Sequence, residues 1–167
     1  VALPLALAAG GQGTAVMDLR AQIDQSCFAF RGYNITNLGR TPELLDHPAY
    51  GTIVERHLRE ASEIASEETG QTIDVIGQLR HRQETSLDTF PAAVALILAT
   101  EVAQVELLSE FHGIEYRNAK LAMGYSLGEI SAIVCAGVMP LADAMRIPVG
   151  LAKDCAELGE NTRMGVL

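Results

Sequence analysis

Apolar residues recur at helical spacing over two long stretches of the chain. In residues 50–65 they lie three and four apart, which predicts an amphipathic helix that ends near Gly70. Residues 91–111 carry apolar side chains on most sides of the corresponding helix. The second helix is therefore expected to lie deep in the fold.

Shorter elements are predicted in the first part of the chain. Residues 3–9 form an apolar run that predicts a buried strand, and residues 10–13 form a glycine-dense turn after it. Residues 18–31 are mixed and predict a partly helical segment, whereas residues 32–39 predict a loop. Thr41-Pro42-Glu43 predicts a helix start, with the Thr41 hydroxyl as N-cap.

The last part of the chain predicts a strand followed by two helices. Leu121-Ala122-Met123 is a short apolar run that enters a glycine turn. Residues 129–138 and 141–158 predict helices, the second broken or kinked at Pro148. Residues 164–167 are apolar and predict the start of another strand. Strands alternating with helices are typical of an α/β domain.

Composition narrows the classes of function. The 167 residues suit a single domain, 1–167, and 49% hydrophobic against 20% charged residues excludes a disordered chain. A net charge of −9 and a pI near 4.8 disfavour nucleic acid and anionic membranes as partners. No apolar stretch is expected to span a membrane, which needs about 20 such residues.

The cysteines and the first residues bear on the compartment. Cys27, Cys135 and Cys155 are an odd number without metal-ligand or redox spacing, so reduced thiols, no metal site and a cytoplasmic location are expected. Residues 1–9 lack an initiator methionine and a basic region, and Pro4 interrupts them. A buried strand is therefore preferred over a secretory signal.

Residues 124–128 carry the clearest chemical signal. Gly124-Tyr125-Ser126-Leu127-Gly128 fits the G-x-S-x-G nucleophile elbow, between a short apolar strand and a helix. A serine at the apex of such a turn has a strained backbone and an exposed hydroxyl. The flanking glycines avoid collisions across the turn, and the helix N-terminus directs the Leu127 N–H toward an oxyanion.

The segment GYSLGEISAIVCAGVMPLADAMR resembles the nucleophile region of malonyl-CoA:acyl-carrier-protein transacylases and of polyketide-synthase acyltransferase domains. Two further segments resemble the family's G-Q-G-S loop and its segment ending in Q-P, so the resemblance spans nearly the whole chain. The matching positions are Ser126, Glu129, Cys135, residues 136–138, Gly11-Gln12-Gly13-Thr14 and Asp88-Thr89-Phe90-Pro91.

The resemblance implies an α/β fold with a hydrolase-like parallel sheet and flanking helices, lacking the family's complete ferredoxin-like subdomain. It implies transfer of an acyl group from acyl-CoA through acyl-Ser126 to an acyl-carrier-protein thiol, in fatty acid or polyketide biosynthesis, without a bound cofactor. The N–H groups of Leu127 and Gln12 would form the oxyanion hole. Glu129 would support the elbow by hydrogen bonds.

Several positions depart from the family pattern. Tyr125 replaces the usual histidine before the nucleophile, which we expect to alter the packing or the pocket. Leu151 stands where an arginine pairs with the malonyl carboxylate, so an uncharged acyl group is expected. Phe90 replaces the glutamine of the Q-P segment. Arg146 matches a different family arginine and is not given the carboxylate-binding role.

The general base is unassigned. A serine nucleophile needs a proton acceptor, normally histidine, and all four histidines precede Ser126. His57 is interpreted as a structural residue, His47 as part of a cap or loop, and His81 as solvated. His112, at the end of the long helix before the elbow strand, is the weak candidate for a substitute base.

Two other functions stay open. A serine esterase or acyl hydrolase would pass the acyl group to water. Alternatively, the chain is a truncated, inactive scaffold with exposed apolar surface, which would self-associate. Residues 164–167 match the point where the family's smaller subdomain begins, so we expect the N-terminal part of an acyltransferase domain. Glu67-Glu68 is interpreted as solvated surface, and Cys135 as a small buried residue.

Overall fold

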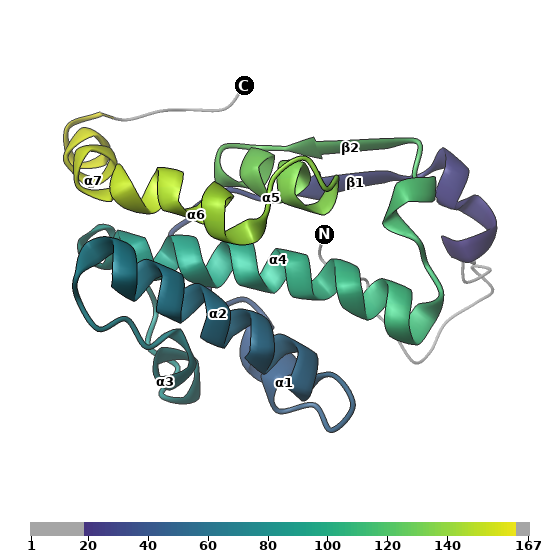
Figure 1. The fold of residues 1–167 in the computed structure, drawn as a ribbon, viewed down its shortest axis with the longest axis horizontal. Coiled ribbons are helices and arrows are strands. Elements are labelled where there is room, and N and C mark those ends of the chain that lie inside the picture. Colours follow the sequence, from purple (N-terminus) through teal and green to yellow (C-terminus); the bar gives the residue numbers. More distant parts are fainter. Residues whose placement is uncertain (1–18, 163–167) are drawn as a thin grey trace, which may run out of the picture.

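Figure 1 shows the fold in a computed structural model, which describes residues 19–162. This part of the chain is mixed α/β and mostly helical. Its elements in order are η1 (Leu19–Gln25), β1 (Cys27–Phe30), α1 (Thr41–Leu45), α2 (Gly51–Thr69), α3 (Val75–Arg80), η2 (Leu87–Thr89), α4 (Phe90–His112), η3 (Tyr116–Asn118), β2 (Leu121–Gly124), α5 (Leu127–Cys135), α6 (Leu141–Gly150) and α7 (Ala152–Asn161). The strands expected at residues 3–9 and 164–167, and the turn at residues 10–13, lie outside the described residues.

The two strands form a parallel pair. Phe28 lies opposite Ala122 and Phe30 opposite Gly124. The Tyr125 N–H donates to the Phe30 carbonyl at 3.1 Å, which extends the ladder by one bond. A parallel pair needs a long crossover, here the segment that carries α1 to α4. Because the carboxyl ends of both strands meet at one edge, the segments that follow β1 and β2 lie side by side.

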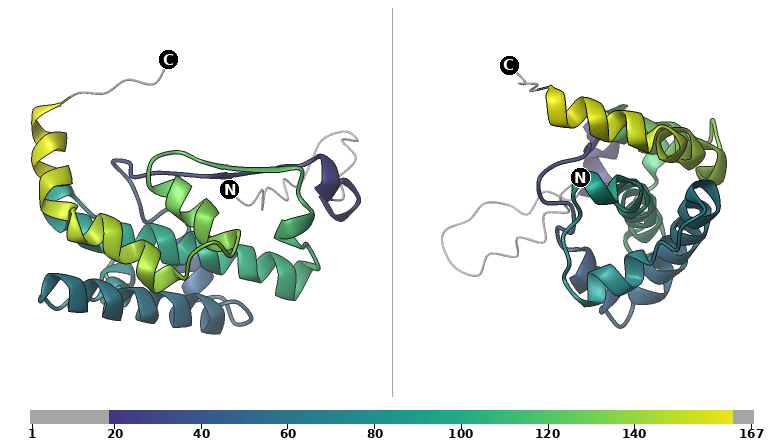
Figure 2. Two further views of the ribbon diagram at one scale, coloured as in Figure 1. Left: turned by 45° about the horizontal axis from the view of Figure 1, so that its top comes forward. Right: turned by 90° about the vertical axis from the view of Figure 1, so that its left-hand side faces the viewer.

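Helix α4 runs through the middle of the molecule, as its end-on view in Figure 2 shows. It contacts α2, α5 and α6 and is buried along most of its length. The sequence prediction of a long, deep helix at residues 91–111 is confirmed, with one further residue at each end. A helix that is apolar on most sides is stable in water only when other elements cover it.

The same segment has the length and composition of a membrane-spanning helix, which the sequence analysis did not expect. Within residues 19–162, Leu87–His112 is the only helix that meets this test. Core helices of soluble proteins also meet it, and 72% of the most apolar window here is buried inside the protein.

Helices cover one face of the small sheet in the described part of the chain (Figure 1). Phe28 and Phe30 pack with Leu108 of α4 and with Ile114. On the other face Leu121 and Met123 are 56% and 54% exposed. The described residues therefore show a two-stranded parallel sheet, without helices on both faces.

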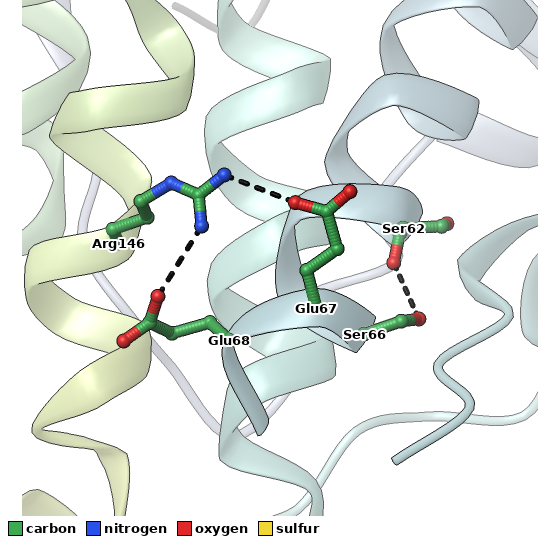
Figure 3. Close-up of polar contacts among 5 residues, drawn as sticks. All are labelled: Ser62, Ser66, Glu67, Glu68 and Arg146. Atoms are coloured by element: carbon green, nitrogen blue, oxygen red, sulfur yellow. Dashed lines mark hydrogen bonds and ion pairs between the residues drawn. The ribbon is translucent and has the colours of Figure 1, made fainter. Parts of the chain in front are cut away.

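Helix α6 is linked to the end of α2 by ion pairs. The Arg146 guanidinium lies 3.0 Å from the Glu67 carboxylate and 3.4 Å from that of Glu68 (Figure 3). These two carboxylates raise the pKa of Arg146. The interpretation of Glu67-Glu68 as solvated surface alone is therefore incomplete, although all three side chains stay partly exposed.

The segment predicted to be partly helical at residues 18–31 contains η1, and residues 27–30 add a strand that was not predicted, in which buried Phe28 and Phe30 alternate with exposed Cys27 and Ala29. Two local predictions were wrong. Thr41 lies inside α1 instead of capping it, with its hydroxyl buried 3.4 Å from that of Thr100. The helix at residues 141–158 continues through Pro148 and breaks at Leu151, between α6 and α7.

Candidate functional site

Ser126 occupies a sharp turn between β2 and α5. Its backbone has φ 55° and ψ −121°, and α5 begins at the next residue. Among the described residues other than glycine, only Ser126 and Arg82 have positive φ. Such a conformation costs about 1–3 kcal/mol and persists only where its surroundings enforce it. The side chain is exposed at the carboxyl edge of the sheet.

Two glycines allow this turn to close. A side-chain carbon at Gly124 would lie 2.1 Å from the Glu129 nitrogen. At Gly128 it would lie 2.2 Å from the Phe30 carbonyl oxygen of the neighbouring strand. Both clashes are with backbone atoms that cannot move away cheaply. The strand, the turn and the helix therefore pack as the sequence pattern predicts for an elbow.

The loop after β1 lies directly against Ser126. A side-chain carbon at Gly32 would lie 2.7 Å from the Tyr125 carbonyl oxygen and 2.9 Å from Ser126 Cβ. Residues 31–33 therefore form one wall of the site. Sequence analysis predicted the loop at residues 32–39 but gave it no place in the site, and it assigned the second oxyanion donor to Gln12, which lies outside the described residues.

Backbone N–H groups without a partner in the described part of the chain occur both in the loop after β1 and at the start of α5. The N–H groups of Gly32, Tyr33 and Leu127 have no hydrogen-bond partner among residues 19–162. Leu127 is also the first residue of α5, where the helix dipole favours negative charge. Unpaired N–H groups beside a nucleophile can stabilise an oxyanion.

Glu129 contributes to the elbow through its backbone. Its N–H donates to the Ser126 carbonyl at 2.9 Å. Its carboxylate is exposed and makes no hydrogen bond within residues 19–162. The side chain stands in the first turn of α5, where an acid is favourable. The hydrogen bonds expected from its carboxylate are therefore absent from the described part of the site.

The four histidines make contacts elsewhere. His57 Nε2 lies 2.7 Å from the Glu106 carboxylate between α2 and α4, and the ring of His112 lies 3.1 Å from the Tyr50 hydroxyl. His47 Nδ1 accepts from the N–H groups of residues 49 and 50, and His81 Nδ1 contacts the Gly77 carbonyl. The structure brings none of these rings to Ser126.

His112 lies at the wrong end of α4 to act on Ser126. Glu101, in the middle of this helix, accepts the N–H of Arg31, the residue that directly follows β1. This part of α4 therefore lies beside the carboxyl edge of the sheet. His112 lies roughly three turns further along, or about 16 Å. The weak candidate for the base, His112, is thus remote from Ser126.

Glu101 is the buried acid that sequence analysis missed. It is 5% exposed, and its Oε1 accepts the Arg31 N–H at 2.8 Å. Burial raises the pKa of Glu101, while the Ser131 hydroxyl and the Arg31 N–H oppose that rise. Glu101 is the only charged residue among residues 90–105, and this was the signal that could have identified it.

A cavity of about 450 Å³ lies on the other side of Arg31, between α1, the loop before it and α4. Arg31, Thr100 and Glu101 contribute to its lining, together with apolar side chains such as Leu44 and Ile97. Its size is typical of small-molecule pockets. Ser126 is not among the lining residues.

The departures from the family pattern occupy different places. Phe90 is buried, and its ring lies 5.3 Å from that of Tyr33 in the loop beside Ser126. Tyr125 is 55% exposed next to Ser126. Leu151 is half exposed at the junction of α6 and α7.

Comparison with protein-family models and with curated proteins finds no match for this chain.

Proposed function

We propose that this chain is an acyltransferase-type protein that uses Ser126 as its nucleophile. It would move an acyl group from a CoA thioester to the thiol of an acyl carrier protein. The observation that carries the proposal is the strained, exposed Ser126 at a strand-to-helix turn, beside the unpaired N–H of Leu127. We also propose that β1 and β2 belong to a hydrolase-like parallel sheet that α5 flanks.

The reaction would proceed in two exchanges. Ser126 Oγ attacks the thioester carbonyl carbon and gives its proton to a base that is not assigned. The C–S bond breaks, and the CoA sulfur leaves as the thiol after it takes up a proton. The carrier thiol then attacks the acyl-serine ester, and Ser126 recovers its hydroxyl.

The N–H of Leu127 and those of the loop at Gly32 and Tyr33 would stabilise the negative charge on the carbonyl oxygen. In this proposal the loop after β1 takes the place expected for Gln12. Removing one such donor typically slows a reaction by about 10²–10³.

A serine esterase or acyl hydrolase is the second candidate. The observation that favours it is the exposure of Ser126, which gives water access to an acyl-serine intermediate. In addition, Leu151 offers no charge to hold a carboxylated acyl group.

Mass spectrometry after mixing with acetyl-, malonyl- or longer acyl-CoA tests these proposals. An acyl adduct on Ser126 that moves to a carrier protein supports the transferase, whereas rapid loss to water supports the hydrolase. Ser126→Ala should abolish the adduct, and Ser109→Ala on α4 serves as a control. The absence of both an acyl adduct and fluorophosphonate labelling would favour an inactive scaffold.

A further inference from the structure

We infer that Glu101 is a positioning residue that holds the two walls of the oxyanion site at a fixed separation. This inference rests on the proposed function, because it gives Glu101 a role in the same site. The observations that carry it are a hydrogen bond from the loop to one oxygen of this buried carboxyl group, and the burial of its other oxygen and of the Ser131 hydroxyl on α5, both without a partner in the described part of the chain.

The first contact is with the loop after β1. Glu101 Oε1 accepts the Arg31 N–H at 2.8 Å. Arg31 directly precedes Gly32, which lies against Ser126. The bond therefore fixes the backbone immediately before the unpaired N–H groups of Gly32 and Tyr33.

The second link is to α5, which packs against α4. Glu101 Oε2 on α4 and the Ser131 hydroxyl on α5 are both buried, and neither has a hydrogen-bond partner in the described part of the chain. The Ser131 hydroxyl lowers the pKa of the Glu101 carboxyl group. Pairing these two atoms with each other would remove the cost of leaving both buried and unpaired. Ser131 lies on the helix whose first N–H is that of Leu127.

The carboxyl group thus links the loop to α5 from inside the protein. Arg31 has two further anchors, because its guanidinium donates to the carbonyls of Thr36 at 3.4 Å and Asn37 at 2.6 Å. Those bonds hold the later residues of the loop, whereas Glu101 holds the backbone next to Gly32. Catalysis by an oxyanion site requires its hydrogen-bond donors to lie within about 0.5 Å of their productive positions.

Two substitutions separate this role from a role of the negative charge. Glu101→Gln keeps the carbonyl that accepts the Arg31 N–H and supplies an amide for Ser131, but removes the charge. Glu101→Asp keeps the charge and shortens the side chain by one methylene, so it cannot reach both partners. Thr100→Val is the matched control, because Thr100 is similarly buried on α4 and lines the same cavity.

The test measures the rate at which a fluorophosphonate labels Ser126, and the exchange of the Arg31 amide hydrogen by NMR. We expect E101Q and T100V to label within about twofold of the unsubstituted chain. E101D should label about tenfold more slowly or worse, consistent with a displaced donor, and its Arg31 amide should exchange faster.

Three results would overturn the inference. One is slow labelling of E101Q with near-normal labelling of E101D, which would indicate a role of the charge. Another is a lower melting temperature of E101D with unchanged labelling of the folded protein, which would indicate a merely structural role. The third is equal Arg31 exchange in all four proteins. If the unsubstituted chain does not label, the proposed function fails, and Arg31 exchange alone decides the positioning role.

Discussion

At the scale of single residues, Ser126 carries the hydroxyl group of the proposed nucleophile on a strained backbone. Its positive φ is unfavourable for residues other than glycine, yet the chain has a serine there. The contacts of Gly124 and Gly128 show how closely the surrounding backbone encloses the turn. Strain of this kind is typical of functional sites.

Replacing Ser126 by glycine and by alanine measures that strain. The strain relieved by glycine, about 1–3 kcal/mol, exceeds the extra chain entropy of unfolded glycine, about 0.4–1 kcal/mol. We expect S126G to exceed S126A in free energy of unfolding by about 1 kcal/mol in urea titrations. Glu110, an exposed residue of α4 with negative φ, is the control site. There we expect E110G to be less stable than E110A, because glycine disfavours a helix. Greater stability of S126A would contradict the strained geometry.

Cys135 illustrates how burial sets reactivity. Burial, with the nearby charge of Glu101, raises the pKa of its thiol to about 12. Because the thiolate is the reactive form, Cys135 should resist alkylation in the folded protein. Cys27 and Cys155 are exposed.

We expect iodoacetamide at about pH 8 to modify Cys27 and Cys155 before Cys135. Peptide mass spectrometry can follow the three sites separately. In denaturant all three should react at similar rates. Equal reactivity in the folded protein would show that Cys135 is more accessible than the structure indicates.

At the scale of elements, the turn before α5 is held by contact between backbones. Gly128 of α5 lies against the carbonyl of Phe30 in β1, so helix and sheet approach more closely than a side chain permits. This contact positions the N-terminus of α5, and with it the Leu127 N–H, at the carboxyl edge of the sheet.

Gly128→Ala should therefore separate α5 from β1. We expect it to lower the free energy of unfolding by about 1–3 kcal/mol and to slow fluorophosphonate labelling of Ser126. Gly159→Ala on α7 is the control, since its side-chain carbon would make an ordinary 3.5 Å contact with Leu87. That change should be neutral or stabilising, as expected for alanine in a helix. Chemical denaturation measures both, and equal stability of the two variants would exclude the close packing.

At the scale of the whole molecule, one face of the sheet is left uncovered by the described elements. Leu121, Met123 and Tyr125 alternate along β2 and its extension, and each is more than half exposed. Exposed Cys27 and Ala29 of β1 lie opposite the first two. Contiguous apolar surface of this kind favours association.

We expect the protein to self-associate through this face. The chain carries a net charge of −9, so copies repel each other, and added salt should strengthen association by screening that repulsion. Met123→Lys should weaken association, because it places a charge on the face. Ile35→Lys adds the same charge to a loop residue that is 86% exposed and outside the face. Sedimentation velocity over a concentration series compares the association of the two variants. An equal effect of both substitutions on association would refute the assignment of this face as the interface.

Sequence patterns predicted some of these features and missed others for identifiable reasons. The long core helix and the G-x-S-x-G turn follow from local spacing, so both could be predicted. The strand at residues 27–30 was missed because all four of its residues are apolar or small, which hides the alternation of buried and exposed positions. The loop at residues 32–39 was predicted, but its position beside Ser126 was missed, because that position depends on the pairing of β1 with β2.

By itself, the sequence determined the position of the long core helix and of the serine at a tight turn. Both follow from local patterns, namely the spacing of apolar residues along a helix and the spacing of glycines around a turn. Only the tertiary structure decided what faces that serine. Parallel pairing brings Gly32 to Ser126 across a crossover of about 90 residues. The same fold buries Glu101 of α4 and brings its carboxylate to the Arg31 N–H of that loop. Both effects depend on contacts between distant segments, and no local pattern encodes them.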